Sequence, residues 1–224
     1  MTSIIVPRGV GDPLRAAAAC LAIAVASPTV GRAATACETP PDLHIEVMAK
    51  FDAAPVRNDY TLADIIALAH QQRRDAGRAL LGFYASEFGY TIDVEPEGDR
   101  ACPARIETIV TLRLQHRLIE IGQEAVTNVC VYPGALRHYR RLAETDEQTV
   151  ARFVEIAATT LSQASDALRD TRAANAEDLD AALRDQVHAI VDKAIMPLHS
   201  ARQDAQQAVN NAGELRQLAS SCSI

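Results

Sequence analysis

The stretch "ARIETIVTLRLQHRLIEIGQEAV", residues 104–126, is rich in Ile, Val, Leu and Thr, the residue types that favour β-strands. The polar pair Gln115–His116 interrupts it near the middle, and we expect the chain to turn there and to form an antiparallel hairpin. In this register Cys102 and Cys130 lie opposite each other across the base of the hairpin. The stretch therefore predicts two strands and a disulfide between these cysteines.

The segments before this hairpin predict two further strands and a helix. Residues 42–51, "DLHIEVMAKF", alternate apolar and polar side chains, which is the period of a half-buried strand. Residues 90–95, "YTIDVE", predict a second strand. Thr61 with Asp64 three positions later has the pattern of a capping box, so a helix should begin at Leu62.

Two long helical segments follow the hairpin. One begins at Pro133, a residue suited to the first helical position, and continues to about residue 172. The other covers about 176–218, where Leu, Ile, Val and Ala recur at spacings of three and four and predict a coiled-coil seam. Pro197 should kink or break this second helix.

These elements predict an α+β fold, in which a small mostly antiparallel sheet with one packed helix is followed by a long antiparallel helical hairpin. We expect a small α+β domain over 37–130 and the helical hairpin over 131–224, packed on that domain and extending from it.

The N-terminal region has the pattern of an export signal. Arg8 and Arg15 precede the apolar run 16–26, and Ala34–Ala36 offers the small residues that signal peptidase requires. We expect residues 1–36 to be removed and the protein to be periplasmic or secreted. No segment reaches the roughly 20 apolar residues of a membrane-spanning helix, so no integral membrane segment is expected.

The charge of the chain argues against two classes of partner. The formal net charge is −7, and residues 1–36 hold three arginines and one aspartate, so the mature chain would carry −9. Such an acidic chain is not suited to bind nucleic acid or anionic lipid.

The cysteines suggest an oxidising compartment. Cys20 lies within the expected signal peptide, and the other four permit two disulfides. If Cys102 pairs with Cys130, Cys37 pairs with Cys222. Free thiols and lipidation at Cys37, which follows "ATA", are the alternatives.

A resemblance to a known family emerges at the head of the first long helix. A strand, the "NDYTLADI" helix, a strand, "ACPA", a hairpin and then "CVYPGALRH" follow one another in this order. This layout resembles that of a family of predicted secreted bacterial zinc-dependent proteases. In that family the helix after the cysteine carries H-E-x-x-H, whose histidines bind zinc and whose glutamate activates the metal-bound water.

The matching positions of this sequence read H-Y-R-R-L. His138 is at the position of the first histidine, Tyr139 at that of the glutamate and Leu142 at that of the second histidine. The first histidine is kept, while the base and the second ligand are replaced. Because a catalytic zinc site needs three protein ligands and a base, the resemblance implies a protease-like scaffold without its catalytic motif. We therefore expect no catalytic residue on this helix.

Two groups of residues remain as candidate sites. His138 with Asp146, which occupies an apolar position of the helical series, is a candidate for a metal site, and a polar residue that fixes helix register is the alternative. His188, Asp192 and His199 have spacings that place them near one helix face, where an exposed polar stripe is the simpler interpretation.

The sequence as a whole favours an exported non-enzymatic protein without a cofactor. It would serve as a binding or interaction module that contacts a protein partner or a second copy through the helical hairpin. The alternative is a zinc metallohydrolase-like enzyme with an altered site around His138.

Overall fold

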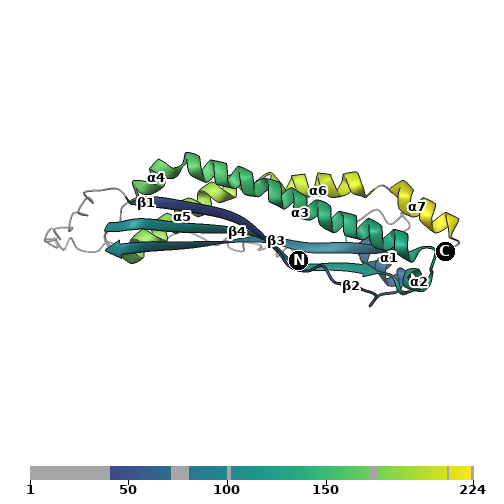
Figure 1. Ribbon diagram of the computed structural model, residues 1–224. Helices are drawn as coiled ribbons and strands as arrows, with labels where there is room; N and C mark the ends of the chain where they lie inside the picture. Colours follow the sequence, from purple (N-terminus) through teal and green to yellow (C-terminus); the bar gives the residue numbers. More distant parts are fainter. Residues whose placement is uncertain (1–40, 72–80, 100–101, 172–175, 211, 223–224) are drawn as a thin grey trace, which may run out of the picture. The chain divides into compact units, whose positions relative to one another are not determined.

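In the computed structural model, the long strand β4 (Cys102–Ile121) takes the place of the predicted hairpin. Strand β3 (Gly82–Asp99) runs antiparallel to β4 along one edge. Strands β1 (Asp42–Phe51) and β2 (Val56–Arg57) both run parallel to β4 (Figure 1). The fold is α+β, but the prediction of a mostly antiparallel sheet is wrong, because two of the three strand pairings are parallel.

Strands β1 and β2 pair with β4 in the same register, so they continue one another along the edge opposite β3. The short gap between them is closed by two hydrogen bonds. The backbone N–H of Asp52 donates to the carbonyl of Leu114 at 2.9 Å, and that of Ile119 donates to the carbonyl of Pro55 at 2.9 Å. The predicted strand 42–51 is confirmed as β1.

The structure describes residues 41–71, 81–99, 102–171, 176–210 and 212–222, which belong to the compact unit Ala33–Ile224. Its helices are α1 (Leu62–Gln71), α2 (Gln123–Thr127), α3 (Tyr132–Gln163), α4 (Ser165–Arg169), α5 (Ala176–Ile195), α6 (Leu198–Val209) and α7 (Ala212–Ser221). None of the helices in these ranges is long and apolar enough to cross a membrane. The expected signal peptide 1–36 and its alternative lipidation site lie outside the described residues.

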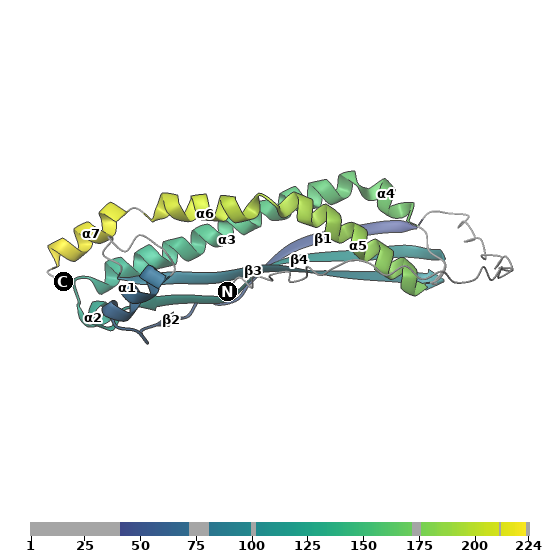
Figure 2. The ribbon, with the colours of Figure 1, turned by 180° about the vertical axis from the view of Figure 1, so that it is seen from behind.

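Within the described residues the structure does not show the predicted long helical hairpin. Helix α3 is continuous and begins with a proline in its first turn, as expected, but it ends at Gln163 and is followed by the short α4. The returning segment is divided into α5, α6 and α7 (Figure 2), with the first break at Pro197. Residues of α3, α5 and α6 share hydrophobic clusters with residues of the sheet. The apolar faces of these helices are therefore buried by the sheet as well as by one another.

Helix α1 begins at Leu62, as predicted, and its capping box is formed. The backbone N–H of Thr61 donates to the Asp64 carboxylate at 3.1 Å, and the backbone N–H of Asp64 donates to the Thr61 hydroxyl at 3.2 Å. The Glu124 carboxylate of α2 accepts the backbone N–H of Leu62 at 2.8 Å. These contacts satisfy donors that the first turn of a helix leaves without a partner.

A β-bulge in β4 explains why this segment resembles a hairpin. Ala85 pairs with Leu118 and Glu87 pairs with Gln115, so His116 and Arg117 together lie opposite Ser86. His116 has a φ of 51°, in the left-handed region that single turn residues adopt. The polar interruption is therefore an extra residue within one strand, and the chain continues in the same direction after it.

The bulge changes which side chains of β4 face the helices. Before it the buried side chains are at even positions, such as Leu112 and Leu114, and after it those in the second cluster are at odd positions, Ile119 and Ile121. Side chains alternate between the two faces of a strand, so one additional residue moves the inward-facing side chains from even to odd positions in the sequence. Arg117 is the first residue to be turned inward by this change.

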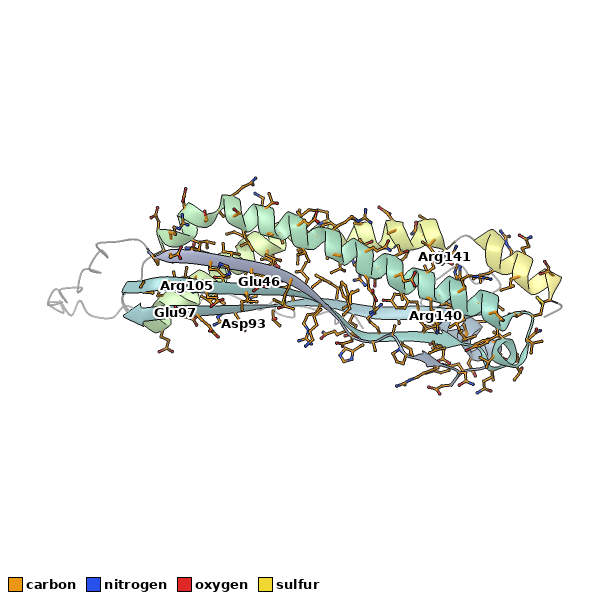
Figure 3. All side chains as sticks on the ribbon, viewed as in Figure 1. Glu46, Asp93, Glu97, Arg105, Arg140 and Arg141 are labelled. Atoms are coloured by element: carbon orange, nitrogen blue, oxygen red, sulfur yellow. A yellow bond between two sulfur atoms is a disulfide. The ribbon has the colours of Figure 1, made fainter. Side chains whose placement is uncertain are left out.

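The face of the sheet away from the helices is polar at the end near the β3–β4 connection. Glu46 of β1 and Asp93 of β3 are exposed there, and the partly buried Arg105 of β4 lies in register with Glu97 of β3 (Figure 3).

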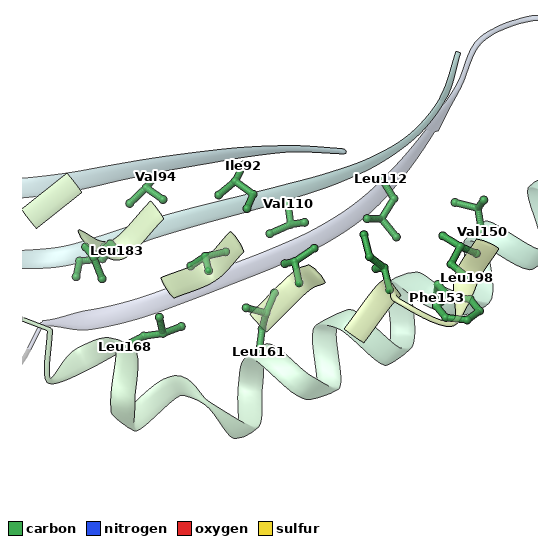
Figure 4. Packing of buried hydrophobic residues seen from close by; sticks show 14 of the residues in the cluster. Ile92, Val94, Val110, Leu112, Val150, Phe153, Leu161, Leu168, Leu183 and Leu198 are labelled. Carbon is green, nitrogen blue, oxygen red and sulfur yellow. The ribbon is translucent and has the colours of Figure 1, made fainter. Parts of the chain in front are cut away.

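The core consists of two hydrophobic clusters along the helix–sheet interface. The first packs Val150, Phe153 and Leu161 of α3 and residues of α5 against the sheet, where Leu112 faces them (Figure 4). The second cluster lies under the N-terminal half of α3 and includes Tyr139. On α3 the two clusters are separated by Asp146, so a polar layer lies between them.

Candidate functional site

The polar layer is built by four elements that meet at the bulge. Strand β3 supplies two side chains, β4 supplies the arginine that the bulge turns inward, α3 supplies two acids, and α6 supplies a second arginine. Its members are Tyr84, Ser86, Arg117, Asp146, Glu147 and Arg202.

Asp146 is the centre of this layer and has no exposed side-chain surface. The Arg202 guanidinium donates from Nε to Oδ1 at 2.6 Å and from Nη2 to Oδ2 at 2.9 Å. The Ser86 hydroxyl donates to Oδ2 at 2.7 Å, and the Tyr84 hydroxyl donates to the same oxygen at 3.0 Å. The carboxylate thus accepts hydrogen bonds from three side chains, two of them on the neighbouring strand.

These contacts change the pKa of the Asp146 carboxyl and of the Tyr84 phenol. Burial alone raises the pKa of Asp146, but the hydrogen bonds from Arg202 and Ser86 and the positive charge of Arg202 outweigh it, so the pKa lies below its ordinary value. Burial raises the pKa of the Tyr84 phenol, and the nearby charge of Asp146 adds to this effect. Asp146 is therefore held as a carboxylate and Tyr84 as a neutral donor.

Arg117 connects the layer to the interruption between β1 and β2. Its guanidinium donates to the carbonyl of Asp52 at 2.8 Å and to the Tyr84 hydroxyl at 3.3 Å, and it forms an ion pair with Glu147. Burial lowers the pKa of Arg117, but Tyr84 and the charge of Glu147 outweigh it and leave the pKa raised. This arginine stays charged and supplies a partner to a carbonyl at the end of β1.

Ser86, Asp146 and Arg202 use their hydrogen-bonding groups on one another. Ser86 donates to Asp146 and accepts a hydrogen bond from Arg202 Nη2 at 2.8 Å, so its oxygen is oriented inside the contact. Asp146, the carboxylate that would activate this serine, is neutralised by Arg202. Because removal of one partner of a buried pair is strongly destabilising, the layer ties α6 to α3 through Arg202 and Asp146.

The candidate metal residues lie apart. His138 and Asp146 are both fully buried on α3, and their spacing of eight positions corresponds to about 12 Å along the helix axis. Within the described ranges no group of three or more His, Cys, Asp or Glu side chains is placed to hold a metal ion. Tyr139 and Leu142, at the other motif positions, are buried in the second hydrophobic cluster.

The structure brings two of the three residues of the other candidate group, His188 and Asp192, into contact with Tyr90, which the sequence did not single out. The Tyr90 hydroxyl of β3 donates to Asp192 Oδ1 at 2.5 Å and lies 3.0 Å from His188 Nδ1, both on α5. Burial and the hydrogen bond to Asp192 raise the pKa of Tyr90 to about 12. His199 is exposed on α6, beyond the break at Pro197.

The cysteine pairing differs from the predicted one. Cys130 forms a disulfide with Cys222, with a Cα–Cα distance of 5.7 Å, so the predicted pairs Cys102–Cys130 and Cys37–Cys222 are wrong. The prediction failed because it depended on a hairpin register that does not exist. Cys37 lies outside the described residues, as does the side chain of Cys102.

Most residues of the polar layer were not singled out from the sequence. Asp146 was noted because an acid in an apolar helical series needs a partner, but that pattern does not say which arginine supplies the charge. Arg202 is 56 residues away, and Tyr84 and Ser86 are on a strand whose predicted length was too short to include them.

Searches with this chain found no matching family model, no matching curated protein and no matching solved structure.

Proposed function

We propose that this protein is an exported, non-enzymatic binding or interaction module that keeps a protease-like scaffold without the catalytic motif. The observation that carries the proposal is the burial of the helix positions that resemble the zinc motif. His138 is 0%, Tyr139 3% and Leu142 6% exposed. A substrate would have to displace the sheet from α3 to reach these side chains.

The polar layer supports the same proposal. Its central carboxylate is fully buried and is bound by Arg202, Ser86 and Tyr84. A general base or a metal ligand needs a lone pair that is open to the reacting group or the ion. In this layer the carboxylate stabilises the packing of α3 and α6 on the sheet.

The face of the sheet away from the helices is the surface that we propose for the partner. Asp42 lies across β4 from Glu97, and Glu46 lies across it from Asp93. The exposed acids of β1 and β3 on this face are Asp42, Glu46, Asp93, Glu95 and Glu97. The partner would be a protein that presents a basic segment, since complementary charge steers association and excludes like-charged surfaces.

The enzymatic alternative is tested by metal content. The mature protein, purified from the periplasm with its disulfide intact, is analysed for zinc alongside His138→Ala. We expect less than stoichiometric zinc in both. One zinc per chain that is lost in His138→Ala would overturn the non-enzymatic proposal.

The binding surface is tested by charge reversal with a matched control. Glu95→Lys/Glu97→Lys changes the proposed face, and Glu144→Lys/Glu155→Lys makes the same change in net charge on exposed positions of α3. Binding to an immobilised octalysine peptide is measured at low and high salt. We expect the first variant to lose binding and the second to keep it, and equal loss in both would refute the assignment of the face.

A further inference from the structure

Helix α7 packs on the N-terminal end of α3 through the second hydrophobic cluster. Leu215 is 3% exposed, and Leu218 is partly buried in the same cluster. Gly134 of α3 permits the close approach, because a Cβ at this position would lie 2.7 Å from Cδ2 of Leu218. Figures 1 and 2 both show α7 alongside this end of α3.

A disulfide attaches the C-terminal end of α7 to the segment just before α3. It joins Cys222, directly after α7, to Cys130, just before α3, across a sequence separation of 92 residues. Cys130 is exposed, and its neighbour Val129 is 90% exposed, so a thiol can approach the bond from solvent. The side-chain amide of Asn128 also donates to the carbonyl of Cys222, at 3.5 Å.

Helix α6 is held by different interactions. Leu198 at its beginning is 1% exposed within the first hydrophobic cluster, and Arg202 forms the buried ion pair with Asp146. Neither contact involves the disulfide. Breaking the disulfide therefore removes an attachment of α7 while the anchors of α6 remain.

We propose that α7 is a redox-controlled strap, which the Cys130–Cys222 disulfide holds closed over α3 and which opens when that bond is reduced. A dithiol reductant supplies two electrons and two protons. One of its thiolates attacks a sulfur of the bond, its second thiol resolves the mixed disulfide, and two protein thiols and a cyclic disulfide result. Opening uncovers the apolar surface around Gly134 that Leu218 covers.

The strap and the disulfide must stabilise each other by the same factor. If the disulfide favours the docked position of α7, docking holds the two thiols together and favours the disulfide equally, by thermodynamic linkage. A substitution that weakens docking without touching a cysteine should therefore make the bond easier to reduce. Leu218→Ala is such a substitution, because it removes the side chain over Gly134.

The test uses the mature chain with Cys37→Ser and Cys102→Ser, so that only the described disulfide responds to dithiothreitol. Hydrogen–deuterium exchange is followed in α7, α3 and β4 before and after reduction. We expect exchange in α7 to rise by about tenfold or more while the centres of α3 and β4 keep their protection, which is local opening. Unchanged exchange in α7 would overturn the proposal, as would a comparable rise in all three elements.

The second measurement is the equilibrium of the disulfide with glutathione. Leu218→Ala should lower the fraction oxidised at a given glutathione ratio, and Leu136→Ala, also partly buried in this cluster but on α3, serves as the control. If Leu218→Ala leaves the equilibrium unchanged, α7 docking and the disulfide are not coupled and the strap is refuted.

Discussion

Replacement of Arg202 by methionine tests the role of the polar layer most directly. Methionine keeps an apolar side chain of similar length and removes the charge. The ion pair is buried, with 13% of the Arg202 side chain and 0% of the Asp146 side chain exposed. Removing one partner of such a pair leaves an uncompensated carboxylate and costs about 3–5 kcal/mol.

A double variant separates the pair from its surroundings. Asp146→Leu/Arg202→Met removes both charges and leaves the Ser86 and Tyr84 hydroxyls without their acceptor. The loss costs about 1–3 kcal/mol for the buried Tyr84 hydroxyl and less for the partly buried Ser86 hydroxyl. We therefore expect the double variant to be more stable than Arg202→Met alone. The free energy of unfolding is measured by urea denaturation with circular dichroism, on protein whose disulfide is intact.

The pH dependence gives an independent check. In the wild-type protein the pKa of Asp146 lies below its ordinary value of 3.8, so its contribution to stability is present above that pH and is lost as the pH falls through the lower value. Arg202→Met raises this folded-state pKa, so the cost of the substitution should be larger at neutral pH than in acid. A cost below about 1 kcal/mol at neutral pH, the median for exposed pairs, would refute the reasoning.

Three further predictions concern packing and the Tyr90 cluster. Gly82→Ala should destabilise by about 1–3 kcal/mol, because a Cβ there would lie 2.1 Å from the carbonyl oxygen of Glu120, whereas Gly89→Ala, whose nearest atom would be 3.6 Å away, should change the unfolding free energy little. Leu161→Ala at a fully buried position should cost about 2–5 kcal/mol in urea denaturation, and Ile156→Ala, at a side chain that is 44% exposed on the same helix, much less; equal costs would contradict the packing. Asp192→Asn should lower the pKa of Tyr90 from about 12 without restoring its ordinary value, because burial is the larger cause; ultraviolet titration against Tyr90→Phe measures it, and an unchanged value would exclude the contact.

Local patterns in the sequence were sufficient where one element determines the structure. The alternation in 42–51 and the capping box at Thr61 and Asp64 are properties of single segments, and β1 and the start of α1 follow them. The start of α3 near Pro133 is of the same kind. None of these depends on which other segment packs nearby.

The sheet could not be predicted in this way, because strand direction is a property of pairs. A parallel and an antiparallel neighbour present the same alternation along one strand. The polar pair at Gln115–His116 has the composition of a turn, and only the pairing of β3 on both sides shows that it is a bulge. The wrong disulfide followed from the wrong register.

The candidate site was predictable to the extent that Asp146 breaks an apolar series. Its partners come from β3 and α6, which are far away in the sequence, and no spacing rule relates them to α3. The same holds for Tyr90, which joins His188 and Asp192 only because α5 packs on β3. Interactions between distant segments require the three-dimensional arrangement.

The bulge also determines where the length of this protein can change. A deletion of His116 would only remove the bulge, because Leu114, Arg117, Ile119 and Ile121 would then alternate regularly toward the helices. One residue inserted directly after Arg117 would instead reverse the facing of the rest of β4, so that Glu120 would be directed at the helices and Ile119 away from them. An insertion near the end of a strand turns few side chains, whereas this insertion would turn both residues that β4 contributes to the second cluster, Ile119 and Ile121. Relatives of this chain should therefore vary in length at the connections or at the bulge itself, and not elsewhere within β4.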